Sequence, residues 1–216
     1  MVTYEKPKHP VIETTVPLDV FERFVNECAR LRLDQPIANS CPFHARLIIA
    51  KLFELAKREI CLVSEALTAC TESGVELYAY RPIIENMNRF LRDPNAVLSI
   101  IIQSGHIEGK ESNEFLREVI NATTRNGTVL VHLPEPGVLS DRVHHFIVVD
   151  EAMIRSESSD APRDRDEPIG ALANFGNLKD ASDLKALYTE LLKYLDKNAP
   201  RVRKFKYPRG AEFTLR

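Results

Sequence analysis

The sequence predicts an α/β fold in which a mixed, mostly parallel sheet carries helices on both faces, with a helical extension at the N-terminus. Short apolar runs alternate with segments of helical periodicity, which is typical of this class. Residues 60–63 and 97–102 are apolar nearly throughout, as strands covered on both faces tend to be. Apolar residues make up 44% of the 216 positions, enough for a sizeable core.

The N-terminal part is predicted to be an arm and two helices. Residues 1–16 have no periodicity, and Pro17 suits the first turn of a helix. Apolar residues then recur at steps of three and four until a loop at residues 34–42, and a second helix follows at about residues 44–58. The residues expected on the inner face of the first helix are Leu18, Phe21, Val25, Cys28 and Leu31.

Strands and helices alternate through the rest of the chain. Residues 74–80 are expected to turn into a helix that starts near Pro82. The next helix should be capped by Ser112 and ended by Asn126-Gly127 in a left-handed cap. A last helix at residues 182–195 should bury Leu184, Leu187, Tyr188, Leu191 and Leu195. The predicted strands are residues 60–63, 97–102, 128–133, 143–149, 153–157 and 170–175.

The composition divides the chain into three regions and excludes several classes of protein. We expect an arm and helix at 1–42, the α/β domain at 43–197 and a basic tail at 198–216. No apolar run is long enough to span a bilayer, and the first 17 residues do not resemble a secretory signal. The cysteines form no CxxC pair, so we expect a cytoplasmic protein with reduced thiols and no cofactor.

The segment richest in chemical groups is residues 141–150. His144 and His145 precede an apolar run that ends at Asp150. Because side chains alternate along a strand, the two histidines should point to opposite faces. Polar residues that follow and could join a site are Arg155, Glu157, Asn174 and Asn177.

In this segment the sequence resembles the phospholipase D superfamily. The family's strand carries His-x-Lys, four further residues and Asp, followed by a segment similar to Gly-Ser-x-Asn. Here the apolar run and Asp150 match that pattern, and Asn174 in Ala171-Leu172-Ala173-Asn174 stands where the family has Asn. The resemblance covers about residues 44–196 in element order. It implies the family's fold, and a homodimer, because family members pair two such half-units.

The same resemblance shows where the motif is degenerate. Counting back from Asp150, the family's His position falls on Val143 and its Lys position on His145. The resemblance implies that this His is the nucleophile that forms a phospho-enzyme. Valine cannot attack phosphorus, and His144 is one residue out of register unless a bulge re-aims it. The Ser of the Gly-Ser pair is also missing. The sequence therefore favours a protein that has lost the family's catalysis.

The residues leave several interpretations of the site open. His145, Arg155 and Asn174 could line a cleft that holds phosphate by hydrogen bonds without hydrolysing it. Glu157 could instead form an ion pair that orients Arg155, and the two histidines could be ordinary surface residues. Adjacent strand residues diverge, so His144, His145 and Asp150 indicate no metal site.

A basic, aromatic C-terminal segment suggests a second kind of contact. The whole chain has a net charge of −2, but residues 201–216 hold six cationic side chains and one acid. Cations neutralise phosphates and rings stack on bases, so the segment could bind nucleic acid. It could equally be a strand that packs its aromatic residues on the body. The cations proposed for contact are Arg201, Arg203, Lys204, Lys206 and Arg209.

Together these features favour a catalytically degenerate phospholipase D-like protein that binds a phosphate-containing ligand or nucleic acid. Its expected role is regulatory or accessory, with bacterial defence as a setting suggested by analogy of fold alone. The first alternative is an active dimeric phosphodiesterase or nuclease that uses His145, or His144 after a bulge. The second alternative is a protein-interaction module whose contact is the basic tail.

Overall fold

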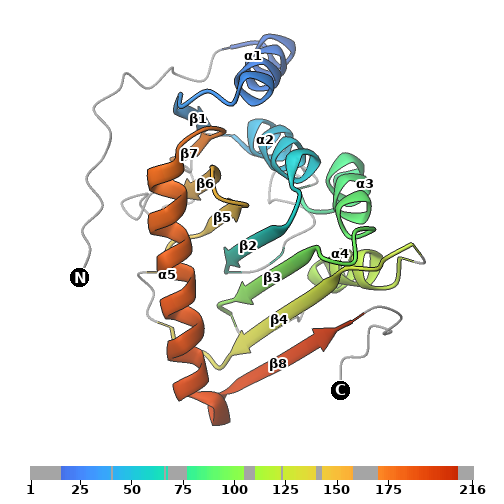
Figure 1. The fold of residues 1–216 in the computed structure, drawn as a ribbon, viewed down its shortest axis with the longest axis vertical. Helices are drawn as coiled ribbons and strands as arrows, with labels where there is room; N and C mark the ends of the chain where they lie inside the picture. The colour runs from blue at the N-terminus through green and yellow to red at the C-terminus, as the bar shows by residue number, and fades with distance from the viewer. Residues whose placement is uncertain are drawn as a thin grey trace.

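Eight strands form one mixed sheet in the order β1-β7-β6-β5-β2-β3-β4-β8 (Figure 1). The computed structural model describes residues 16–39, 41–65, 67, 77–104, 110–122, 124–139, 143–157 and 170–208. The strands are β1 Ile37–Asn39, β2 Glu59–Ser64, β3 Val97–Ile102, β4 Thr128–Pro134, β5 Phe146–Val149, β6 Met153–Glu157, β7 Ala171–Asn174 and β8 Val202–Tyr207. The helices are α1 Leu18–Leu31, α2 Pro42–Leu55, α3 Arg81–Phe90, α4 Lys110–Ile120, α5 Leu178–Lys197 and the 3-10 turn η1 Ala199–Arg201.

The α/β class is confirmed, but the prediction of a mostly parallel sheet is wrong. Only β2–β3 and β3–β4 are parallel pairs, whereas the remaining neighbours are antiparallel. The parallel centre comes from two helical crossovers, through α3 and α4. The tight turn between β5 and β6 permits only an antiparallel pair, because a parallel pair needs a long crossover. The two edge strands, β1 and β8, are antiparallel as well.

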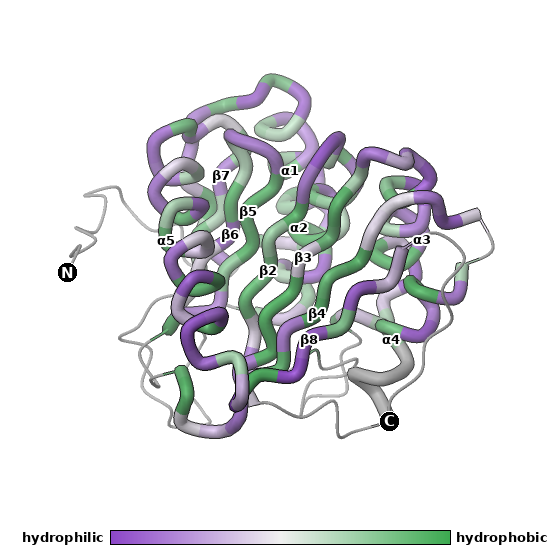
Figure 2. The backbone as a smooth tube through the Cα atoms, turned by 60° about the horizontal axis from the view of Figure 1, so that its bottom comes forward, coloured by the Kyte–Doolittle hydropathy of each residue, from purple (hydrophilic) through white to green (hydrophobic). Residues whose placement is uncertain are grey.

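Each face of the sheet packs against its own layer of helices. The α1–α4 layer covers one face, where the apolar side chains of β2 are Ile60 and Leu62. On the other face Cys61 and Val63 pack with residues of α5. This alternation is what a strand buried on both sides requires. The tube in Figure 2 is accordingly green along β5, β2 and β3.

Several predicted boundaries need correction. Ser112 lies inside α4 instead of capping it, and Asn126-Gly127 lies beyond the end of α4 at Ile120. Gly127 does not have the positive φ of a left-handed cap. That conformation occurs after α1, at Arg32 with φ 52°, whose N–H bonds the carbonyls of the last turn. The local composition predicted that the chain turns near residues 126–127, but it did not predict which helix ends in a left-handed cap.

The inner faces of the first and last helices are narrower than their apolar patterns suggested. In α1 Leu18 and Leu31 are exposed, whereas Phe21, Val25 and Cys28 are buried. In α5 Leu187 is exposed. The helix also begins four residues before the predicted Ser182, since Asn177 is its N-cap. The predicted loop at 34–42 contains β1.

The first and the last described strands belong to the same sheet. β1 lies at one edge through its pairing with β7, and β8 lies at the other through its pairing with β4. Among the described residues, none of the helices is long and apolar enough to cross a membrane.

Candidate functional site

His145 is held from both sides of its ring. Its Nδ1 lies 2.8 Å from Oε2 of Glu157, and its Nε2 accepts a hydrogen bond from the backbone N–H of Glu65 at 3.0 Å. These two contacts fit the tautomer that carries its proton on Nδ1 and leaves the lone pair of Nε2 as the acceptor. β5 begins only at Phe146, so the prediction of a strand from residue 143 is wrong and His145 stands just before the strand.

Glu157 joins His145 to Arg155. The register of β5 and β6 places Glu157 beside His145, where its N–H also bonds the His145 carbonyl at 2.9 Å. Its second carboxylate oxygen, Oε1, accepts a bond from Nη1 of Arg155 at 2.8 Å. The ion pair that the sequence suggested between Arg155 and Glu157 is therefore present. We call His145, Glu157 and Arg155 the triad.

The triad fixes the charge of Glu157. Burial alone raises the pKa of this carboxyl, but the bond from His145 and the positive charge of Arg155 together outweigh burial and hold the pKa at about 2. Arg155 is buried, and its Nε has no hydrogen-bond partner among the described residues. The carboxylate is thus ionised at neutral pH and orients the imidazole.

Two further polar residues next to the triad were not predicted. Tyr78, in the turn before α3, is buried and forms a side-chain hydrogen bond with Ser64 at the end of β2. Burial raises the pKa of the Tyr78 phenol, and both Arg155 and Glu157 are near enough to influence it. Residues 74–80 gave no periodic signal, so only their turn could be predicted. These groups gather at the carboxyl end of β2, where ligands of parallel α/β sheets often bind.

Asp150 lies at the opposite end of β5 and serves the backbone. Its carboxylate accepts bonds from the N–H groups of Lys57, Arg58 and Glu59 at 3.0, 2.8 and 3.0 Å. Its own φ is 52°, a left-handed value that Asp tolerates better than most residues. Asp150 therefore fastens the link between α2 and β2, and the structure does not bring it together with His145.

The side chains of the two asparagines bond to groups outside the triad. Asn174 is buried, donates to Oδ1 of Asp34 at 2.8 Å and accepts from the N–H of Gly176 at 2.9 Å. Asn177 accepts from the N–H of Asp180 at 2.7 Å as the N-cap of α5. Because β7 runs parallel to β5, both asparagines lie toward its Asp150 end. Their amides are used in local structure.

The predicted nucleophile positions separate as well. Val143 packs on the α5 side of the sheet, and its carbonyl accepts a bond from Gln103 at 3.1 Å. His144 is half-buried and makes no hydrogen bond or ion pair with any described residue. In the described segments no group of three or more His, Cys, Asp or Glu side chains is arranged to hold a metal ion.

The basic tail is an edge strand over residues 202–207. Its cations Arg203, Lys204 and Lys206 are exposed, and Lys204 pairs with Asp196 of α5. Phe205 and Tyr207 stack with ring centroids 6.2 Å apart and pack on the body. Arg201 pairs with Glu135 at 3.0 Å, and Arg209 lies outside the described residues.

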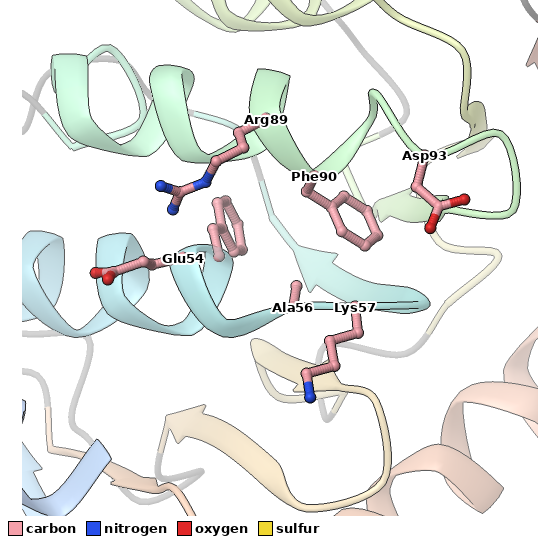
Figure 3. A pocket seen from close by; sticks show the side chains of 7 residues that line it. Glu54, Ala56, Lys57, Arg89, Phe90 and Asp93 are labelled. Atoms are coloured by element: carbon pink, nitrogen blue, oxygen red, sulfur yellow. The ribbon is translucent and has the colours of Figure 1, made fainter. Parts of the chain in front are cut away.

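An open groove of about 450 Å³ lies elsewhere, between the C-terminal ends of α2 and α3 (Figure 3). It is lined by Phe53, Glu54, Ala56, Lys57, Arg89, Phe90 and Asp93. None of the predicted site residues lines this groove. Lys57 lies two residues before β2 begins at Glu59, so the groove is at the other end of that strand from the triad.

Comparison with known proteins shows likeness of structure without likeness of sequence. No family model and no curated protein matches the chain. The fold is similar to that of Nuc from Salmonella typhimurium, a phospholipase D family member, with 13% identity and a TM-score of 0.48 over 79% of this chain and 99% of Nuc. NucT from Helicobacter pylori gives 12% identity and a TM-score of 0.47 over 74% of this chain and 96% of NucT.

A third similar structure is TrmBL2, described as an archaeal chromatin protein with a novel mode of DNA binding. It has 13% identity and a TM-score of 0.49, over 81% of this chain and 59% of the TrmBL2 chain. At such low identities these similarities concern the fold and carry no information on activity. The chemistry must be judged from the side chains of this chain.

Proposed function

We propose that this protein is a catalytically degenerate phospholipase D-like protein that binds a phosphate-containing ligand at the triad without hydrolysing it. The observation that carries the proposal is the engagement of both ring nitrogens of His145. A histidine whose Nε2 lone pair accepts the Glu65 N–H has no free lone pair to attack phosphorus. Val143, at the position that the resemblance gives to the nucleophile, has no nucleophilic atom.

The same contact provides a way to bind an oxyanion. Glu65 N–H and His145 Nε2 face each other at 3.0 Å beside the end of β2. If His145 takes up a proton, Nε2 becomes a donor, and an oxyanion can lie between two N–H groups. Glu157 stabilises the imidazolium, and the charge of Arg155 keeps the region from becoming negative overall. Binding of phosphate is therefore expected to be accompanied by proton uptake.

The second candidate is an active phosphodiesterase, and one observation favours it. The 2.8 Å contact of Glu157 with Nδ1 orients the imidazole as a carboxylate orients a catalytic histidine. Among the described residues, the Glu65 N–H is the only group that forms a hydrogen bond with Nε2. Movement of Glu65 would free that nitrogen, and a homodimer could bring two such histidines together.

The test combines turnover with binding. Purified protein is incubated with bis-p-nitrophenyl phosphate and with labelled single- and double-stranded DNA and RNA, with and without EDTA. Calorimetric titration with the same nucleic acids and with inorganic phosphate follows, in buffers of different ionisation enthalpy. We expect no turnover, and binding with proton uptake that decreases at least tenfold in His145→Ala. Lys193→Gln, which alters an exposed cation of α5 outside both the triad and the basic tail, serves as the control.

Turnover that survives EDTA and disappears in His145→Ala would establish the phosphodiesterase instead. Binding that His145→Ala leaves intact and that Lys206→Gln abolishes would move the contact to the basic edge strand. Absence of both turnover and binding would favour the protein-interaction module. Light scattering during size-exclusion chromatography would test the proposed homodimer.

A further inference from the structure

The guanidinium of Arg46 lies over two aromatic rings. Its Cζ lies 4.9 Å from the centroid of Phe43 and 4.6 Å from that of Tyr80. Phe43 is three residues before Arg46 on α2, and Tyr80 is the N-cap of α3. Two such contacts restrict the position of the guanidinium, because a cation is attracted to the flat face of an aromatic ring.

Arg46 has no polar partner among the described residues, unlike the arginines that form ion pairs. It makes no hydrogen bond or ion pair with any described residue, and its Nε is a buried donor that remains unsatisfied. Each of the arginines in five described ion pairs meets a carboxylate: Arg23, Arg30, Arg81, Arg155 and Arg201. The N–H groups of the Arg46 guanidinium therefore remain available for an acceptor.

The local field around Arg46 is positive for a second reason. α2 and α3 run side by side in the same direction, since Figure 3 shows their C-terminal ends together and Arg46 touches Tyr80 at their N-terminal ends. The N-terminus of a helix carries a partial positive charge. Neither helix has an acidic residue in its first turn, whereas α1 has Asp19 and α5 has Asp180 there.

The caps of α2 and α3 do not neutralise this charge. Tyr80 gives α3 no side-chain cap, and α2 is capped only by the Sγ of Cys41, which accepts from the His44 N–H at 3.5 Å. At the opposite ends Arg89 lies in the last turn of α3, and Lys57 follows the C-cap of α2, so that a cation lies near each negative pole (Figure 3). Compensation is thus found at one end of the helix pair and is missing at the other.

We infer that Arg46, with the first turns of α2 and α3, forms a binding site for a phosphate group, separate from the triad. A phosphate accepts two in-plane bonds from a guanidinium and is stabilised by both helix N-termini. Phe43 is 44% exposed, so it offers a ring surface to a base attached to the phosphate. A phosphate monoester is the class of ligand that this arrangement fits.

The test measures binding of inorganic phosphate and of AMP by calorimetry and by the Nε–Hε signal of Arg46 in NMR. We expect millimolar phosphate to shift that signal and to raise the melting temperature of the wild type. Arg46→Gln should weaken binding at least fivefold. Arg46→Lys should weaken it as well, because an ammonium lacks the planar pair of donors.

Two controls separate this site from other cations and from the triad. Arg89→Gln removes a cation from α3 at the other end of the helix pair and should leave phosphate affinity unchanged. His145→Ala should leave the Arg46 signal responsive, so failure of the triad proposal would not affect this result. Tighter binding of AMP than of phosphate, lost in Phe43→Ala, would identify a nucleotide, whereas equal binding would identify the phosphate group alone.

The inference is overturned if saturating phosphate does not move the Arg46 Nε–Hε signal, or if Arg46→Gln binds phosphate as the wild type does. Should Arg46→Gln fail to fold, the NMR titration of the wild type and the binding of Arg46→Lys decide the question.

Discussion

The residues of the triad show how far single positions could be predicted. An ion pair between Arg155 and Glu157 was one of two interpretations of these residues, because residues two apart share one face of a strand. The partnership of Glu157 with His145 was not predicted, since it depends on the register between β5 and β6. Asn174 and Asp150 were grouped with the triad from motif spacing, yet their side chains bind backbone and loop groups elsewhere.

Glu157 should make stability depend on pH in the acid range. Its pKa is about 2 in the folded protein against an ordinary value of 4.5, so the unfolded chain binds the proton first as pH falls. The contribution is fully present above pH 4.5 and is lost as pH falls toward 2. The shift corresponds to about 3 kcal/mol in the free energy of unfolding.

Urea unfolding at several pH values between 6 and 2 checks this expectation. Glu157→Gln should lose about 3 kcal/mol less than the wild type across that interval, although it starts from lower stability. Glu135→Gln, which alters an exposed carboxyl, should follow the wild-type slope. Parallel curves for Glu157→Gln and the wild type would contradict the assigned pKa.

At the scale of elements, the positions of strands were predicted well from apolar runs. The ends of helices were predicted less well from capping residues. β3 has the predicted bounds, because five buried residues in a row after Val97 leave little alternative. β8 was left open between a strand and a nucleic-acid tail. It is a strand through its pairing with β4. Its last residue is also held by Arg125, which is buried and donates to the carbonyls of Ile120, Gly127 and Tyr207 at 2.7, 3.1 and 2.7 Å.

Arg125→Met should loosen β8 more than the rest of the sheet. The substitution leaves buried carbonyls without a donor, which costs about 2–4 kcal/mol in the free energy of unfolding. Hydrogen exchange should accelerate most in residues 202–207. Arg92→Met, which changes an exposed arginine nearby, is the matched control, and equal exchange in both variants would show that Arg125 does not clamp β8.

At the scale of the whole molecule, the described sheet ends with β1 at one edge and with the basic strand β8 at the other. The composition and the alternation of elements predicted one α/β domain, but not that the terminal strands would be antiparallel. β8 presents its outer backbone together with Arg203, Lys204 and Lys206. Cations on an edge strand discourage pairing with another sheet, because two such edges repel each other.

Removing the charge from that edge should promote association. The double substitution Lys204→Val/Lys206→Val leaves an apolar edge strand, so we expect a larger mass than that of the wild type in light scattering, increasing with concentration. Lys193→Val/Lys197→Val makes the same change on an exposed part of α5 and should behave like the wild type. An unchanged mass for the β8 variant would contradict a protective role.

The position of β1 in the sheet has a consequence for synthesis on the ribosome. β1 pairs with β7, and Ile37 lies opposite Ala173 in their register. The parallel strands β2, β3 and β4 can pair once residues 59–134 have emerged. At translation rates of about 5–20 residues per second, β1 remains without its partner for on the order of ten seconds. Among the described strands it waits longest, so the first strand to be made is also the one most open to a chaperone.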